Sequence, residues 1–150
     1  MRCVIQRVKH AKVEVSERLS GEIGAGLLIL SSFEEADDAD DEAWMVKKLL
    51  NMRIFPDEEG VMNRSVMDAD GELLVVSQFT LHASTKKGNR PSYIKAARPE
   101  SAKKKYHDFI VSLAKASGKI IEMGEFGAMM EVSLVNDGPV TIIIDSKNRE

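Results

Sequence analysis

The 150-residue sequence contains a single cysteine, Cys3, and aromatic residues make up only 5% of it. One cysteine excludes an internal disulfide and paired cysteine ligands for zinc. We expect Cys3 to be a buried structural thiol, because it lies in a short apolar stretch near the N-terminus. No P-loop, nucleophile elbow or His-Glu-x-x-His motif occurs. The usual signatures of nucleophilic and metal-dependent hydrolases are therefore missing.

Long hydrophobic runs are also missing. The most apolar stretch, residues 23–30, contains two glycines and is far shorter than the roughly 18 residues of a membrane span. Charged residues interrupt the N-terminus, so no signal peptide is expected. With 43% hydrophobic and 30% charged residues, the composition is that of a globular domain. We expect one domain over residues 1–150, located in the cytoplasm and without a membrane partner.

The order of apolar patterns predicts an α+β domain with two main helices. A first helix follows the acidic run and buries a stripe of Ala43, Val46, Leu49 and Leu50, and a second helix begins at Pro99 and ends at Gly118. Most connections look too short for a helical crossover, which predicts a mostly antiparallel sheet. The expected strands cover residues 3–5, 11–15, 22–30, 72–81, 119–123, 130–135 and 140–145.

Residues 34–42 carry seven carboxylates, a pattern with two interpretations. The run is either a metal site or the acidic start of a helix. Its spacing is not that of an EF-hand loop, and acidic residues at a helix N-terminus complement the helix dipole. We therefore favour a helix start, and we expect neither a metal nor a cofactor.

Polar residues follow the apolar run 73–76, and they mark the first candidate site. Polar groups in such a place are either hydrogen-bonded parts of the core or members of a site. Thr80 and His82 would share one face of an extended chain, so a threonine nucleophile with a histidine base is one hypothesis. Nothing in the sequence orients that histidine.

Residues 136–141, Asn-Asp-Gly-Pro-Val-Thr, form the second candidate. Their simplest interpretation is an ordinary turn between two strands. The alternative is a cis bond before Pro139, a rigid feature that would fix the directions of two neighbouring carbonyl oxygens.

A formal net charge of −3 argues against a polyanion partner. The charge is unevenly distributed, however. Residues 86–105 contain eight Lys or Arg and one Glu, a local charge of +7 that leaves −10 for the rest of the chain. This stretch is either a solvated helix flank or a phosphate-binding surface around Gly88 and Tyr93, and we favour the second.

Three segments in the correct order, residues 77–81, 88–92 and 132–141, resemble the D-aminoacyl-tRNA deacylase family, and the similarity extends from residue 5 to residue 141. The resemblance implies a compact, barrel-like α+β domain that forms a homodimer with active sites at the interface. It also implies hydrolysis of D-aminoacyl-tRNA, with Gly-tRNA(Ala) as a further substrate and no cofactor.

The resemblance further implies roles for individual residues. One wall of the pocket would be formed by four consecutive residues, Ser77, Gln78, Phe79 and Thr80. A cis dipeptide from the partner subunit, Gly138-Pro139, would exclude L side chains, and Arg7 would hold that dipeptide in place. Phe126 and Met130 would receive the terminal adenosine. Four cations would contact the tRNA: Lys86, Lys87, Arg90 and Lys95.

Two mechanisms remain open at this point. An aminoacyl ester is already activated, so positioning and carbonyl polarisation suffice for its hydrolysis. The resemblance implies that the terminal 2′-hydroxyl of tRNA assists while backbone amides near Phe79 and Thr80 hold the oxyanion; alternatively, Thr80 is the nucleophile. A rival hypothesis is a non-catalytic nucleic-acid-binding module that uses residues 86–105.

Overall fold

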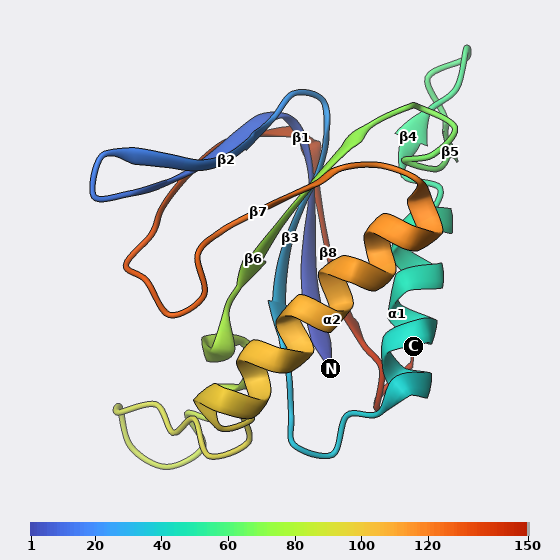
Figure 1. Cartoon of the computed structure of the whole chain (residues 1–150). Helices are drawn as coiled ribbons and strands as arrows, with labels where there is room; N and C mark the ends of the chain where they lie inside the picture. The colour runs from blue at the N-terminus through green and yellow to red at the C-terminus, as the bar shows by residue number, and fades with distance from the viewer. Residues whose placement is uncertain (150) are drawn as a thin grey trace.

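The computed structural model describes residues 1–149 and is organised around two long strands that pair antiparallel (Figure 1). These are β1 (Arg2–Val15) and β8 (Glu131–Asp145). The apolar patterns predicted two separate strands in each segment, which is wrong. The pairing shifts register twice between Gln6 and His10 without ending, so residues 136–139 belong to β8 and do not form a separate turn.

Four further strands complete the main sheet, in the order β2-β1-β3-β6-β7, and a two-stranded hairpin of β4 and β5 is separate from it. β1 therefore pairs with β8 along one edge and with β2 and β3 along the other. The remaining strands are β2 (Arg18–Ile23), β3 (Gly26–Ser32), β4 (Phe55–Pro56), β5 (Met62–Arg64), β6 (Glu72–Ser77) and β7 (Ile121–Met123).

The main sheet is mostly antiparallel, as predicted, but it is mixed rather than purely antiparallel. β3 and β6 pair in parallel, as do β6 and β7. Parallel neighbours need a long crossover, usually a helix. The two helices supply these crossovers: α1 (Ala39–Asn51) lies between β3 and β6, and α2 (Pro99–Ser117) lies between β6 and β7. The α+β class with two helices and a mostly antiparallel sheet is confirmed, and the two parallel pairs are the exception.

The sheet curls until its two ends meet, which confirms the barrel-like shape. Ser20 Oγ on β2 donates a hydrogen bond to the Met123 carbonyl of β7, at 3.1 Å. One hydrophobic core, the inner core, lies inside the curved sheet. A second, the outer core, lies between the sheet and the two helices, which pack on the same side of the sheet (Figure 1). The buried members of the inner core are Val8, Ala11, Val13, Ile23, Leu28, Leu74 and Val76.

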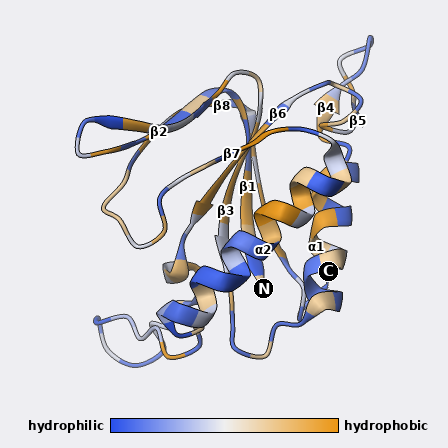
Figure 2. Cartoon of the chain, in the orientation of Figure 1, coloured by the Kyte–Doolittle hydropathy of each residue, from blue (hydrophilic) through white to orange (hydrophobic). Residues whose placement is uncertain are grey.

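Residues 73–76 of β6 are fully buried because alternate side chains enter the two cores. Figure 2 shows the hydrophobic colour of the central strands. Cys3 lies in the outer core without exposed surface, and burial raises the pKa of its thiol. The prediction of an inert structural cysteine is confirmed.

Both helices begin where the sequence indicates, and α2 also ends at the predicted residue. Asp38 caps α1 and forms a reciprocal capping box with Asp41, so the acidic run is the start of a helix. Ala43 is exposed, however, and Met45 takes its expected place in the core. Pro99 stands in the first turn of α2, and Gly118 ends that helix with a positive φ of 67°. Within residues 1–149, neither helix is long and apolar enough to cross a membrane.

Gly26 allows β3 and β6 to approach closely. A Cβ atom at this position would lie 2.0 Å from the Glu72 carbonyl oxygen, whereas a Cβ at Gly24 would meet only the flexible Glu72 carboxylate, at 3.5 Å. We predict that Gly26→Ala lowers the free energy of unfolding by about 3 kcal/mol or more. Gly24→Ala should change it by less than about 1 kcal/mol. Equilibrium urea unfolding measures both, and equal losses would contradict this explanation.

Candidate active site

The first candidate site lies where β6 leaves the sheet. Ser77 is in register with Ser31 of β3, and the Gln78 amide still donates a hydrogen bond to the Ser31 carbonyl, at 2.7 Å. The chain then forms a short 3₁₀ helix, η1 (Phe79–His82), seen beside the end of β6 in Figure 1. The expected strand 72–81 therefore ends at residue 77. Because η1 is exposed on one side, its first residues face solvent.

Two backbone amides of this turn have no acceptor within residues 1–149. The first hydrogen bond of η1 runs from the Leu81 amide to the Gln78 carbonyl, at 3.1 Å. The amides of Phe79 and Thr80 precede it and have no partner in the turn. Phe79 is 56% exposed, and Thr80 is half-buried. Two adjacent N–H donors of this kind suit an oxyanion that develops on a bound carbonyl group.

Thr80 is held by a neighbouring amide side chain. Gln78 Nε2 donates a hydrogen bond to Thr80 Oγ1, at 2.5 Å. An amide NH₂ cannot accept a proton, so Gln78 positions the hydroxyl and does not activate it. Ser77 is half-buried at the start of the turn. The four consecutive residues predicted from the sequence thus form one continuous feature of the surface.

The predicted pairing of Thr80 with His82 is wrong. His82 lies in a helical turn rather than an extended chain, and its side chain is only 3% exposed. Its Nδ1 is 2.6 Å from Ser32 Oγ, and its Nε2 is 3.9 Å from a Glu34 carboxylate oxygen. Burial lowers the pKa of His82, an effect that Glu34 opposes. The histidine therefore supports the turn from behind and is not a base for Thr80.

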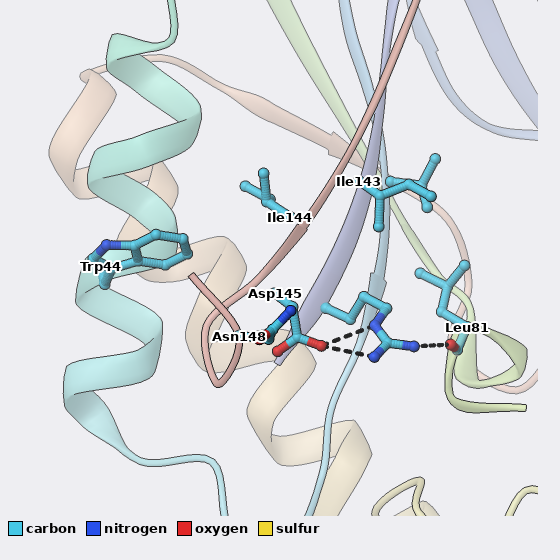
Figure 3. Close-up of a pocket in the computed structure, with 8 residues that line it drawn as sticks. Trp44, Leu81, Ile143, Ile144, Asp145 and Asn148 are labelled. Carbon is cyan, nitrogen blue, oxygen red and sulfur yellow. Dashed lines mark hydrogen bonds and ion pairs between the residues drawn. The ribbon is translucent and has the colours of Figure 1, made fainter. Parts of the chain in front are cut away.

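Arg2 holds the far end of η1, a role that no local sequence pattern indicates. Its guanidinium donates from NH1 to the Leu81 carbonyl, at 2.8 Å, and from Nε to Asp145 Oδ2, at 2.9 Å (Figure 3). These bonds connect the turn to the ends of β1 and β8. The three bonded residues line a pocket of about 410 Å³ whose walls also include Trp44 and Ile143.

The second candidate site is on β8. The Gly138-Pro139 bond is cis. Arg7, only 9% exposed, lies next to this dipeptide: its Nε is 3.2 Å from Asp137 Oδ2, and a Cβ on Gly138 would be 3.0 Å from its NH2. Arg7 NH1 also donates to the Ile54 carbonyl, at 2.5 Å. The structure thus brings Arg7 and the dipeptide together.

One chain does not bring the two candidate sites together. Arg7 pairs with Leu27, which pairs with Leu73. Ser77 lies four residues beyond Leu73, about 13 Å along the strand direction. It also lies three strands away from β8 in the order β8-β1-β3-β6. Gly138 and Ser77 could therefore share a pocket only if two chains associate.

The loop between β7 and β8 borders the end of β6. The Tyr106 hydroxyl of α2 bonds to the carbonyls of Val75 and Gly124, at 2.9 and 3.1 Å, and the Phe126 ring packs 5.8 Å from the Tyr106 ring. Phe126 belongs to the outer core, whereas Met130 packs against the inner core. These two predicted residues therefore pack against different cores.

The basic loop, residues 83–97, follows η1. The Ser84 and Ser92 amides and carbonyls pair with each other, at 2.8 and 2.9 Å, and close the first part of this loop. Within residues 1–149, no ion pair involves its exposed cations, Lys86, Lys87, Arg90 and Lys95. The Tyr93 ring packs edge-on against Phe79, with 5.0 Å between ring centroids. The basic loop and the candidate site are therefore in contact.

Known proteins resemble the chain over its whole length. Proteins named D-aminoacyl-tRNA deacylase from Bacteroides thetaiotaomicron and Flavobacterium johnsoniae are 57% and 58% identical to it, each over 150 residues and 100% of both chains. A solved structure described as "c-Myc DNA Unwinding Element Binding Protein" superposes with a TM-score of 0.92 at 41% identity, covering 97% of this chain and 98% of that one.

A family model agrees with these relatives. The model described as D-Tyr-tRNA(Tyr) deacylase matches residues 4–145, which include both candidate sites and the basic loop. By this match and by its full-length similarity to the curated relatives, the chain belongs to the D-Tyr-tRNA(Tyr) deacylase family.

Proposed function

We propose that this protein hydrolyses the ester bond of D-aminoacyl-tRNA and releases a D-amino acid and tRNA. The carrying observation is the turn after β6, where the Phe79 and Thr80 amides have no acceptor within residues 1–149. The names of the full-length relatives supply the substrate class. The turn offers donors for an oxyanion without a nucleophile and base, which suits a substrate that is already activated.

The reaction adds water to the ester carbonyl and breaks the bond to the terminal ribose oxygen. The carbonyl oxygen gains negative charge, which the amides of Phe79 and Thr80 stabilise. Thr80 Oγ1, held by Gln78, positions the ester, and Ser77 completes that wall. The 2′-hydroxyl of the terminal adenosine assists by moving a proton, and the ribose oxygen leaves with a proton. The scheme requires neither metal nor cofactor.

Thr80 acts as a positioning group in this scheme rather than as a nucleophile. A threonine nucleophile needs a base within hydrogen-bond reach. Its observed partner is the Gln78 amide, and the nearby His82 ring is engaged with Ser32. These contacts favour the mechanism assisted by tRNA over the alternative.

Discrimination against L-amino acids would arise between two subunits. In the homodimer that we propose, Gly138-Pro139 of one subunit enters the Ser77–Thr80 pocket of the other and leaves no room for an L side chain. Arg7 keeps the dipeptide in position through its contacts at Asp137 and Gly138. Steric exclusion of this kind accepts many D side chains. It also accepts glycine, so Gly-tRNA(Ala) is a second substrate.

The face of the sheet opposite the helices offers a surface for this dimer. Val4 pairs with Leu30 on one side and Ile143 on the other, so the three side chains share one face. Ile143 is 68% exposed, and Val4 and Leu30 are half-buried. Leu30 also pairs with Val76, next to the candidate site. A second copy on this face would lie near Ser77.

The tRNA would approach over the basic loop. Lys86, Lys87, Arg90 and Lys95 are exposed and suited to phosphate contacts. Phe126 would receive the terminal adenosine near the end of β6, and Met130 would contribute from the inner-core side. Because aminoacyl-tRNA is a substrate of the translation apparatus, we place the protein in the cytoplasm.

A second candidate function is nucleic-acid binding without catalysis. It is favoured by the name of the similar solved structure, which describes a protein that binds a DNA element. This alternative predicts that tRNA and DNA bind equally well with strong salt dependence, and that no ester is hydrolysed.

One experiment tests the activity and its chirality together. With EDTA present, the protein should release D-tyrosine from D-Tyr-tRNA and leave L-Tyr-tRNA intact, because a rigid backbone excludes the L side chain. The measurement is the loss of charged tRNA with time. Equal hydrolysis of both substrates would contradict the chiral site, and binding without hydrolysis would favour the second candidate function.

A substitution on the proposed interface tests whether the protein forms the proposed dimer. Ile143→Asp places a charge on the proposed interface, so it should yield a monomer in sedimentation equilibrium and reduce the ratio of D-Tyr-tRNA to L-Tyr-tRNA hydrolysis. Val111→Asp on α2 is a matched control, because Val111 is 65% exposed and Ile143 is 68% exposed. A dimeric Ile143→Asp protein, or a monomer with full discrimination, would contradict the cross-subunit site.

A further inference from the structure

An exposed aromatic pair connects the candidate site, which contains Phe79, to the basic loop, which contains Tyr93. Phe79 and Tyr93 pack edge-to-face, with centroids 5.0 Å apart and an angle of 74° between the rings. Phe79 is 56% exposed, Tyr93 is 38% exposed, and the next residue, Ile94, is 90% exposed. The pair thus presents aromatic surface to solvent, although large apolar side chains are usually buried.

The backbone holds Tyr93 in place on both sides. The paired Ser84 and Ser92 amides and carbonyls precede it, and a turn bond from the Ala96 amide to the Tyr93 carbonyl, at 3.0 Å, follows it. On the other side of the pair, Ser32 Oγ donates to the Phe79 carbonyl, at 3.4 Å. These backbone bonds and the contact between the rings restrict the pair, so it loses little conformational entropy when a ligand binds.

The charge around the pair favours an anionic ligand. Between Ala83 and Ala97 the chain has four cations and no acidic residue. Aromatic rings flanked by unpaired cations are the chemistry that binds single-stranded nucleic acid: bases stack on the rings, and phosphates lie against the cations. The faces of the two rings offer no pattern of donors and acceptors, so stacking on them would tolerate any base.

We propose that Phe79 and Tyr93 form a stacking surface for the unpaired nucleotide that precedes the aminoacylated adenosine of tRNA. The inference rests on the proposed deacylase function. Phe79 is adjacent in sequence to Thr80, which positions the ester in the proposed mechanism. Tyr93 packs against the Phe79 ring, and it therefore lies farther from the reacting group.

The surface would explain how an unspecific pocket selects charged tRNA over other D-amino acid esters. Steric exclusion at the amino acid reads only its chirality, and stacking one base farther on requires a single-stranded RNA end. Binding there contributes affinity remote from the reacting carbonyl. Its loss should therefore raise KM and leave kcat unchanged.

The test compares Tyr93→Ala and Tyr93→Phe with the unmodified protein on two substrates. One is D-Tyr-tRNA, and the other is D-tyrosyl-adenosine, which lacks the preceding nucleotide. Tyr93→Ala should raise KM for D-Tyr-tRNA about tenfold, within the range reported for one base stack. Tyr93→Phe keeps the ring and should retain the original KM. On D-tyrosyl-adenosine both variants should match the unmodified protein.

A D-Tyr-tRNA with an abasic residue before the terminal adenosine allows a double-mutant cycle, in which the ring and the base are removed separately and together. It should bind the unmodified protein about tenfold more weakly, and Tyr93→Ala should then weaken binding no further. Val111→Ala is the control for removal of an exposed apolar side chain, and it should change neither KM. An unchanged KM for Tyr93→Ala on D-Tyr-tRNA, or equal losses on both substrates, would overturn the proposal. A monomeric Tyr93→Ala protein would also overturn it.

The outcome remains distinguishable if the deacylase function itself fails. In that case no variant hydrolyses D-Tyr-tRNA, and the Kd for uncharged tRNA takes the place of KM. Tighter binding of intact tRNA than of abasic tRNA, lost in Tyr93→Ala, would support the stacking surface independently of catalysis. Equal binding of both RNAs by the unmodified protein would overturn it.

Discussion

The hydrogen bond from the Gln78 amide to the Ser31 carbonyl marks the point where a buried strand becomes an exposed surface. Residues 73–76 must remain in the sheet because their side chains fill both cores. After Gln78 the chain turns into η1, and the first two amides of that turn have no acceptor within residues 1–149. The proposed oxyanion site is therefore a direct consequence of where β6 ends.

Several remote groups keep that turn in place. Arg2 connects the Leu81 carbonyl to Asp145, and Ser32 lies between the buried His82 ring and the Phe79 carbonyl. Tyr106 bonds to the carbonyl of Val75 just before the site. Donors fixed in this way need no reorganisation when charge develops on the substrate. In the proposed mechanism, the chain supplies positioned donors and the substrate supplies the proton-transfer group.

Local patterns predicted only part of this arrangement. The two ends of α2, the acidic start of α1 and the end of the apolar run before Ser77 all depend on neighbours in sequence, and they were found. The parallel pairs and the continuous β8 depend on partners far along the chain, which periodicity does not report. Thr80 and His82 were paired wrongly because a 3₁₀ turn replaces the extended geometry that alternation implied. The role of Arg2 has no local signature at all.

The most direct test of the central claim changes the substrate and leaves the protein intact. We would measure the single-turnover rate constant for D-Tyr-tRNA that ends in 2′-deoxyadenosine, with the amino acid on the 3′-oxygen, against that of the natural ending. If the substrate supplies the proton-transfer group, the deoxy substrate should react about 10²- to 10⁴-fold more slowly. Equal rate constants would contradict the account and would return Thr80 to consideration as the nucleophile.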